Sequence, residues 1–170
     1  MTGLDLVEGK GQVEPFIACF RCGTCCTEYQ VNISLAEGQR IADRLELVWE
    51  EFLNRYADKI WPGIKNFLIR KHNGACVFLE RIEGSKVTRC RIHAFRPSSC
   101  IDWVPGLYRR ECQKGLTKYW GLVVSLSGQL EGSTQKVREF CDLLEITGNL
   151  ECPGPRVDCS GCHRIFRLST

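Results

Sequence analysis

Four cysteines crowd into eight residues of the chain, and they are the side chains best suited to chemistry. They form the run Cys19-Phe20-Arg21-Cys22-Gly23-Thr24-Cys25-Cys26. A thiolate is a soft anionic ligand, and packing four together is costly unless a cation holds them. The spacing Cys19-x2-Cys22-x2-Cys25 lets three sulfurs converge on one ion or cluster, so this run predicts a metal centre.

The same C-x2-C-x2-C spacing opens the bacterial ferredoxin pattern, which continues x3-C-P. Here Tyr29 stands at the fourth cysteine position, so any remaining ligand must come from elsewhere in the chain. Cys26 adds a second constraint. Neighbouring side chains diverge in extended backbone, so Cys25 and Cys26 rarely serve one metal easily. Either two centres lie side by side, or one of the pair is not a ligand.

Cysteines further along the chain form two more groups. The second group is Cys76, Cys90 and Cys100, and the third is Cys152, Cys159 and Cys162. The first two groups supply seven thiols, one short of two four-ligand centres, and Cys152 is the expected eighth ligand. The isolated pair Cys159-x2-Cys162 has the spacing of half a zinc site. Cys112 and Cys141 lie outside these groups.

The composition favours metal binding over a disulfide framework. The chain has 170 residues and 12 cysteines, enough length to bury a core without disulfides. Residues 1–8 contain neither a basic region nor an apolar region of an export signal. No apolar run approaches the roughly 20 residues of a membrane span. We therefore expect a cytoplasmic protein with reduced thiols and no membrane association.

Charge and motifs exclude several other classes. The net charge of +3 comes from scattered Lys and Arg, so nucleic acid is not an expected partner. Nucleotide-binding loops, hydrolase nucleophile motifs and zinc-protease motifs are missing from the sequence. The spacing C-x3-C-x2-C of radical S-adenosylmethionine enzymes is also missing. The sequence therefore identifies no catalytic residue, and whether the protein is an enzyme stays open.

Residues 16–105 resemble the YkgJ-type cysteine-cluster family, which is described as zinc- or iron-chelating. The matching pieces are Phe16, Cys19 to Cys26, Gly74-x-Cys76-x-Phe78-Leu79, Cys90-x-Ile92-His93 and Arg96-Pro97-x-x-Cys100. The resemblance implies a metal or iron–sulfur role for the seven cysteines in these pieces. Flagellin lysine N-methylase carries a related domain, so the resemblance also implies that one branch of the family is enzymatic.

The metal stays open between iron–sulfur and zinc. Zinc sites usually use two separated C-x2-C or C-x2-H pairs, which close a tetrahedron. Three thiolates in one short run suit a cubane cluster better, because a cluster spreads its ligands over several irons. Iron–sulfur, as a 4Fe-4S cluster, is therefore favoured over zinc.

Two further residues in the family signature are candidates for contact with the cofactor. His93 can ligate a metal, relay a proton or donate a hydrogen bond to a sulfur, and its alternative is a structural role. Arg96 can pair with the negative charge of a thiolate cluster, and its alternative is a solvated surface position.

Two helices should frame the cysteine loops. Ser34-Leu35-Ala36-Glu37 is a capping box, and apolar residues recur at helical spacing as far as Tyr56. We predict one helix over residues 35–56, with its aromatic stripe in the core. A second helix is predicted over residues 134–146, capped by Ser133 and ended by Gly148. Cys141 is expected on its apolar face.

Between the helices the sequence is β-like. Residues 76–82 and 86–93 flank Glu83-Gly84-Ser85, which predicts a hairpin with a three-residue loop. In that register Cys90 faces Phe78, and Cys76 is a diagonal neighbour on the same face. Both sulfurs would then approach one site. A four-residue loop would place them on opposite faces, so the metal hypothesis prefers the shorter loop.

These elements predict a small α+β single domain with metal-bound cysteine loops between two helices and a short antiparallel sheet. Residues 1–15 are a flexible lead-in, 16–105 the cysteine-cluster core, and 106–170 a C-terminal extension with a helix and a cysteine-rich tail, packed on the core. The expected function is one or two cysteine-ligated iron–sulfur clusters, in electron transfer or as a cluster-bearing subunit with a redox or complex partner protein. The alternatives are a lysine N-methyltransferase-like enzyme and a zinc-stabilised structural or interaction module.

Overall fold

The computed structural model describes residues 17–58 and 65–151, with side chains as far as Ile146. The helices are α1 (Thr24–Glu28), α2 (Leu35–Arg44), α3 (Trp49–Tyr56), α4 (Ser98–Ile101), α5 (Arg110–Gly115) and α6 (Thr134–Glu151), with a 3₁₀ turn η1 (His93–Phe95) and a π turn η2 (Leu116–Trp120). The strands are β1 (Asn32–Ser34), β2 (Asn66–Leu68), β3 (Lys71–His72), β4 (Ala75–Cys76), β5 (Leu79–Arg81), β6 (Thr88–Cys90), β7 (Val123–Val124) and β8 (Leu130–Glu131).

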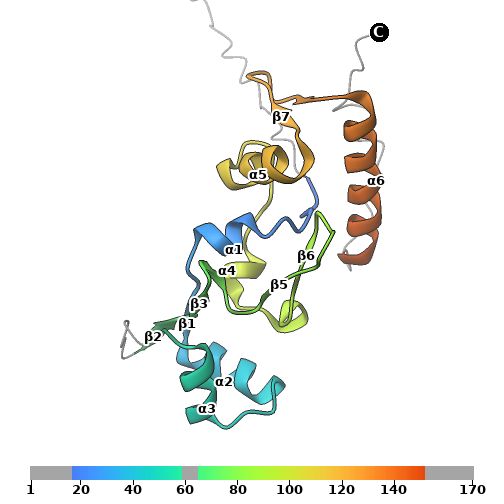
Figure 1. Cartoon of the computed structure of the whole chain (residues 1–170). Helices are drawn as coiled ribbons and strands as arrows, with labels where there is room; N and C mark the ends of the chain where they lie inside the picture. Colours follow the sequence, from blue (N-terminus) through green and yellow to red (C-terminus); the bar gives the residue numbers. More distant parts are fainter. Residues whose placement is uncertain (1–16, 59–64, 152–170) are drawn as a thin grey trace, which may run out of the picture.

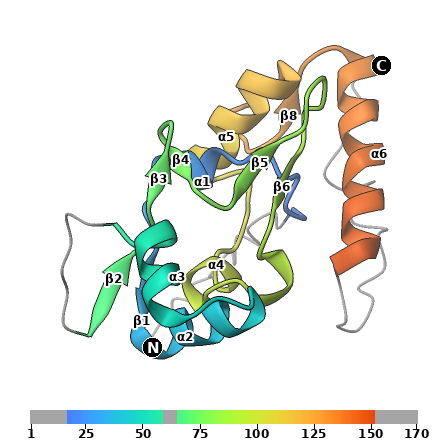
Figure 2. The ribbon, with the colours of Figure 1, turned by 60° about the horizontal axis from the view of Figure 1, so that its bottom comes forward.

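This arrangement confirms the predicted α+β class, in a small domain. The strands form four separate two-stranded antiparallel sheets rather than one, pairing β1 with β2, β3 with β4, β5 with β6, and β7 with β8. The pair α2 and α3 lies at one end of the molecule and α5 with β7 at the other (Figure 1). Between the two ends lie α1, α4 and the β5–β6 hairpin, and α6 runs alongside them (Figure 2).

The predicted helix over residues 35–56 is two helices. Its capping box is confirmed, because Ser34 N donates to Glu37 Oε2 over 3.0 Å and Glu37 N donates to Ser34 Oγ over 3.3 Å. After Arg44 the chain turns at Glu46, whose φ of 56° lies in the left-handed region and stops the helix. Apolar residues keep their helical spacing across this break because α2 and α3 both pack against one core.

The first core confirms that the aromatic stripe is structural. Phe52 is fully buried, its ring stacks on Trp49 at 5.5 Å, and it meets Phe67 of β2 edge-on at 6.2 Å. The buried residues of this core are Ile33, Ile41, Ala42, Phe52, Tyr56, Ala57, Phe67, Ile69, Phe78 and Ile92. Cys76 and Cys90 pack against its edge, so the core holds the backbone that carries these two thiols.

The predicted hairpin register is wrong by one residue. Cys90 pairs with Leu79 rather than Phe78, and the loop between β5 and β6 covers residues 82–87. Cys76 belongs to a different hairpin, where it pairs with Lys71 of β3. The chain turns at Val77 and Phe78 between the two strands. Cys76 and Cys90 are therefore not neighbours on the face of one hairpin, and tertiary packing sets how close their sulfurs lie.

A second core joins the start of the described chain to its later elements. Its buried residues are Phe20, Cys22, Leu107, Cys112, Leu116, Trp120, Leu122, Leu130 and Phe140. The ring of Phe140 on α6 lies 5.2 Å from those of both Phe20 and Trp120, edge-on to each. The predicted division of the chain at residue 105 stays a prediction.

The second predicted helix is confirmed at its start and extends further than expected. Ser133 Oγ accepts a hydrogen bond from Lys136 N over 3.4 Å, as expected of a capping residue. Gly148 does not end α6, which continues to Glu151. None of the helices among residues 17–58 and 65–151 is both long enough and apolar enough to cross a bilayer.

Candidate metal centre

Helix α1 carries two neighbouring cysteines, Cys25 and Cys26. Gly23 precedes it with a φ of 73°, a left-handed conformation that glycine adopts without strain. At its other end Lys71 Nζ donates to the carbonyl of Thr27 over 2.6 Å, which satisfies one of the last helical carbonyls. The two sulfurs lie 4.0 Å apart. That distance is close to the separation of about 3.8 Å between two sulfurs on one tetrahedral zinc.

Three further thiols lie near this helix, each on a different element. Cys76 ends β4, Cys90 ends β6, and Cys100 lies on α4. The charge of Cys26 interacts with those of Cys76 and Cys90, and the charge of Cys100 interacts with those of Cys76, Cys90 and Cys25. We call Cys25, Cys26, Cys76, Cys90 and Cys100 the thiol group. All five are half-buried, and none forms a disulfide.

Burial keeps most of the thiol group protonated in the absence of a bound cation. Burial raises the pKa of Cys100 to about 11 and also raises the pKa values of Cys76 and Cys90. The hydrogen bond between Cys25 and Cys26 is the largest influence on that pair, lowering the pKa of Cys25 and raising that of Cys26. Bringing these thiols to the anionic form therefore requires positive charge at the site.

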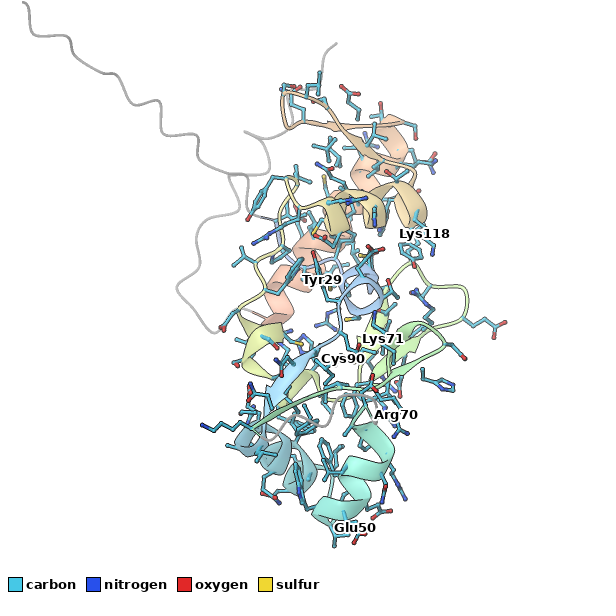
Figure 3. All side chains as sticks on the ribbon, turned by 90° about the vertical axis from the view of Figure 1, so that its left-hand side faces the viewer. Tyr29, Glu50, Arg70, Lys71, Cys90 and Lys118 are labelled. Carbon is cyan, nitrogen blue, oxygen red and sulfur yellow. The ribbon has the colours of Figure 1, made fainter. Side chains whose placement is uncertain are left out.

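Three cations stand close enough to supply part of that charge. Arg96 and Arg91 act to lower the pKa of Cys90, and Lys71 acts to lower that of Cys76, each opposing the effect of burial. Cys90 and Lys71 both lie in the middle of the molecule beside α1, whereas Glu50 lies at the far end of α3 (Figure 3). The predicted role of Arg96 beside a thiolate cluster stays a prediction, and its observed influence is on the pKa of Cys90.

His93 contacts Arg96 rather than a sulfur. Arg96 Nη1 lies 2.6 Å from His93 Nε2. A guanidinium only donates hydrogen bonds, so Nε2 must accept and the imidazole is neutral. The predicted cofactor-binding role of His93 stays a prediction, and its observed contact is with the side chain that faces Cys90.

Three more cysteines gather on the other side of α1. A small cleft is lined by Cys19, Cys22, Cys25 and Cys112, together with Phe20, Arg21, Gly23, Trp103, Pro105 and Glu111. We call it the cysteine cleft. Cys22 and Cys112 are buried in the second core, and burial raises the pKa of each thiol. The run Cys19–Cys26 is thus divided, with Cys26 facing the thiol group and Cys22 lying against α5.

Sequence reasoning missed Cys112, which lies outside the three groups that spacing defined. Its thiol interacts with the charges of Cys22 and Cys25, which lie some ninety residues earlier. No spacing rule links Cys112 to the earlier run. The sequence signal that could have found it is its place on a short helix whose buried positions, Cys112 and Gly115, are three residues apart.

The structure describes only some of the remaining cysteines and signature residues. Cys152, Cys159 and Cys162 lie outside the described residues, as does Phe16 of the family signature. Cys141 is half-buried on α6, beside Phe140. In the described ranges no three His, Cys, Asp or Glu side chains converge closely enough to hold a metal ion. The chemistry of the donor set nevertheless fits zinc or iron, because thiols predominate among the possible ligands in both groups.

Comparison with known families covers both groups of thiols. The model of the CxxCxxCC family, described as "Putative zinc- or iron-chelating domain", matches residues 18–114, which is more than half of the chain. The matched range includes every cysteine of the thiol group and of the cysteine cleft, and it ends two residues after Cys112. No solved structure matches the chain.

Proposed function

Because the chain belongs to the CxxCxxCC family of zinc- or iron-chelating domains, we propose that it is a metal-binding protein whose thiol group holds an iron–sulfur cluster, with 4Fe-4S favoured. The observation that carries this proposal is that five half-buried thiols from α1, β4, β6 and α4 lie near enough for their charges to interact. Four of these thiols would satisfy either a single zinc ion or a 4Fe-4S cluster. The C-x2-C-x2-C spacing of Cys19, Cys22 and Cys25, which opens the bacterial ferredoxin pattern, favours the cluster.

Each part of the surroundings has a physical role in holding such a group. Cys26, Cys76, Cys90 and Cys100 would supply the thiolates, with Cys25 beside them. Arg96 and Lys71 would offset part of their negative charge, which reduces the cost of burying it. The first core beneath Cys76 and Cys90 would keep water from one side of the site. When bound, an iron–sulfur cluster supplies one-electron transfer chemistry.

Electron transfer or service as a cluster-bearing subunit requires a protein partner. Exposed apolar side chains support such a role, because Ile101 directly follows Cys100 and is 55% exposed, with Val104 and Tyr108 exposed further along the same segment. Redox encounters use small interfaces, so a surface of this kind suits a transient partner. Thiols without disulfides also suit the reducing cytoplasm as the compartment.

Anaerobic purification followed by iron, zinc and sulfide analysis tests the proposal. We expect iron and acid-labile sulfide in equal amounts, with a brown visible absorption that dithionite bleaches. Replacement of Cys90 by Ser should lower the iron content, since it removes one ligand of the thiol group. Zinc without sulfide in a colourless protein would overturn the iron–sulfur proposal and favour the zinc-stabilised module. Full-length protein that is folded and free of both metals would overturn metal binding by these thiols altogether.

A further inference from the structure

We propose that the cysteine cleft is a second, separate thiolate metal site, formed by Cys19, Cys22, Cys25 and Cys112. This inference rests on the proposed function and deepens it, because it gives the number of centres and adds a ligand, Cys112. The thiol group then keeps Cys26, Cys76, Cys90 and Cys100. Each centre has four thiols, which matches the ligand number of a closed zinc site or of a cubane cluster.

The first support is that the four thiols line one cleft although they come from distant parts of the sequence. Cys19 and Cys22 precede α1, Cys25 lies on it, and Cys112 lies on α5. Cys22 and Cys112 are only 8% and 6% exposed, while Cys19 and Cys25 are half-buried. Two of the thiols therefore form the floor of the cleft and two form its rim, so an ion can enter from the rim.

The second support is the close approach of α5 to Cys22. A Cβ atom at Gly115 would lie 2.5 Å from Cys22 Sγ, so only glycine fits at that position without a shift. Gly115 is three residues after Cys112, and residues at this spacing share a helix face. The face of α5 that carries Cys112 is thus the face that packs against Cys22. Cys22 Sγ also donates a hydrogen bond to Thr24 Oγ1 over 3.3 Å, which orients the thiol.

The third support is the direction in which Cys25 and Cys26 diverge. Successive side chains on a helix project about 100° apart, so α1 sends its two thiols to different sides. Cys25 lines the cysteine cleft and interacts with Glu111, which lines it too. The charge of Cys25 also reaches Cys76 and Cys100, whereas Cys26 interacts with Cys76 and Cys90 and is not among the residues that line the cleft. Helix α1 therefore lies between the two groups, and two centres side by side use both of its cysteines.

The competing explanation is that Cys22 and Cys112 are merely small apolar residues of the second core, since cysteine often has that role. The two explanations differ in what a conservative substitution does. Serine replaces cysteine with little change of size but is a poor ligand for soft metals. Under the competing explanation Cys112→Ser alters stability alone, whereas under the proposal it also removes one centre.

The test measures iron, zinc and sulfide per chain in anaerobically purified full-length protein. The variants are Cys112→Ser and Cys19→Ser for the cleft, Cys90→Ser for the thiol group, and Cys141→Ser as the matched control on α6. We expect Cys112→Ser and Cys19→Ser each to lower the metal content about twofold, while Cys90→Ser removes the other half. The double variant Cys19→Ser/Cys90→Ser should contain almost no metal, and Cys141→Ser should match the unchanged protein.

The outcomes separate this proposal from the proposed function. Full metal content in both Cys112→Ser and Cys19→Ser, with loss of all metal in Cys90→Ser, would leave the thiol group as a metal site and overturn the second site. Full metal content in all three would overturn the proposed function as well. If Cys112→Ser does not fold, Cys19→Ser decides between the second metal site and the competing explanation, because Cys19 is only half-buried.

Discussion

At the scale of single residues, positively charged side chains outside the cysteine motifs oppose the effect of burial on the thiol group. Arg96 lowers the pKa of Cys90 more than Arg91 does, and its guanidinium also contacts His93 Nε2 at 2.6 Å. The pair fixes where the positive charge sits relative to the sulfur. A fixed charge beside a buried thiolate stabilises the anion more than a mobile one does, because no further ordering is needed when the metal binds.

Replacement of Arg96 by Leu should weaken metal retention. Loss of a partner that contacts the ligands typically lowers metal affinity about 10- to 100-fold. Metal retention is measured by anaerobic competition with a chromophoric chelator, as the rate and extent of metal transfer to the chelator.

Arg89→Leu is the matched control for Arg96→Leu. Arg89 lies next to Cys90 on β6 but is 68% exposed and pairs with Glu80 over 2.7 Å. Its loss should leave metal retention unchanged. Equal retention in the two variants would show that Arg96 does not stabilise the thiolates.

At the scale of elements, a single carboxylate ties the helix that carries Cys100 to α2. Glu37 Oε1 accepts hydrogen bonds from Ser98 N over 2.9 Å and Ser98 Oγ over 2.7 Å, while Oε2 accepts from Ser34 in the capping box. Two helix starts thus share one side chain. Desolvation alone would raise the pKa of Glu37, but the hydrogen bonds from Ser98 and Ser34 outweigh it and lower the pKa to about 2.

This lowered pKa predicts a pH dependence of stability. A carboxyl whose pKa falls on folding stabilises the protein above its unfolded pKa of about 4.3, and that stabilisation is lost as the pH falls through about 2. Glu37→Gln should therefore lower the free energy of unfolding at pH 6, and the difference should shrink between pH 4.5 and pH 2. Chemical denaturation across this range measures it.

Glu83→Gln provides the comparison for Glu37→Gln, because Glu83 is an exposed carboxylate in the β5–β6 loop. The difference in unfolding free energy between Glu83→Gln and the unchanged protein should stay the same from pH 6 to pH 2, because Glu83→Gln keeps Glu37. If the difference in unfolding free energy between Glu37→Gln and the unchanged protein stays constant from pH 6 to pH 2, the ionised carboxylate of Glu37 is not what links α4 to α2.

Helix α6 is the element that closes the second core behind the cysteine cleft. Phe140 is 1% exposed and contacts Phe20, which lines the cleft, and Trp120. Phe140→Ala should cost about 3–5 kcal/mol of unfolding free energy, because it leaves a cavity beside the two remaining aromatic rings. Denaturant unfolding of the metal-loaded protein measures the cost.

Ile146→Ala serves as the control on the same helix, since Ile146 is 61% exposed. Its cost should stay within about 0.5 kcal/mol, as for other surface positions. Similar costs at the two positions would mean that α6 is not anchored through Phe140.

At the scale of the whole molecule, a metal held by the thiol group would cross-link distant segments. The thiols come from α1, β4, β6 and α4, and α1 and α4 lie between the α2–α3 end of the molecule and the end with α5 (Figure 1). The four sheets have two strands each, so little backbone pairing spans the molecule. A bound metal would join the ends of long loops, where a cross-link restricts the unfolded chain most.

Removal of the metal should therefore lower the melting temperature. A cross-link over such loops contributes about 3 kcal/mol, which corresponds to roughly 6–12 °C for a protein of this size. Thermal unfolding is followed by circular dichroism under anaerobic, reducing conditions, before and after treatment with a chelator. Chelator already saturated with metal is the control, and an unchanged melting temperature after complete metal removal would contradict a structural role.

Sequence reasoning succeeded where local chemistry decides and failed where packing decides. The Ser34–Glu37 capping box and the start of α6 follow from adjacent residues, and both are confirmed. The break at Glu46 escaped notice because neither glycine nor proline marks it. The register of Cys90 was wrong because a loop of residues 82–87 fits the same turn signals as a three-residue loop.

The sequence by itself determined that this is a small α+β protein of a metal-chelating family, since ligand type and short-range spacing are properties of adjacent residues. Tertiary structure alone decided which thiols meet. It placed Cys26 near Cys76 and Cys90, it placed Cys100 near Cys76, Cys90 and Cys25, and it placed Cys22 near Cys112. The physical reason is that convergence of distant side chains depends on how two hydrophobic cores orient the elements between them, and no local pattern encodes that orientation.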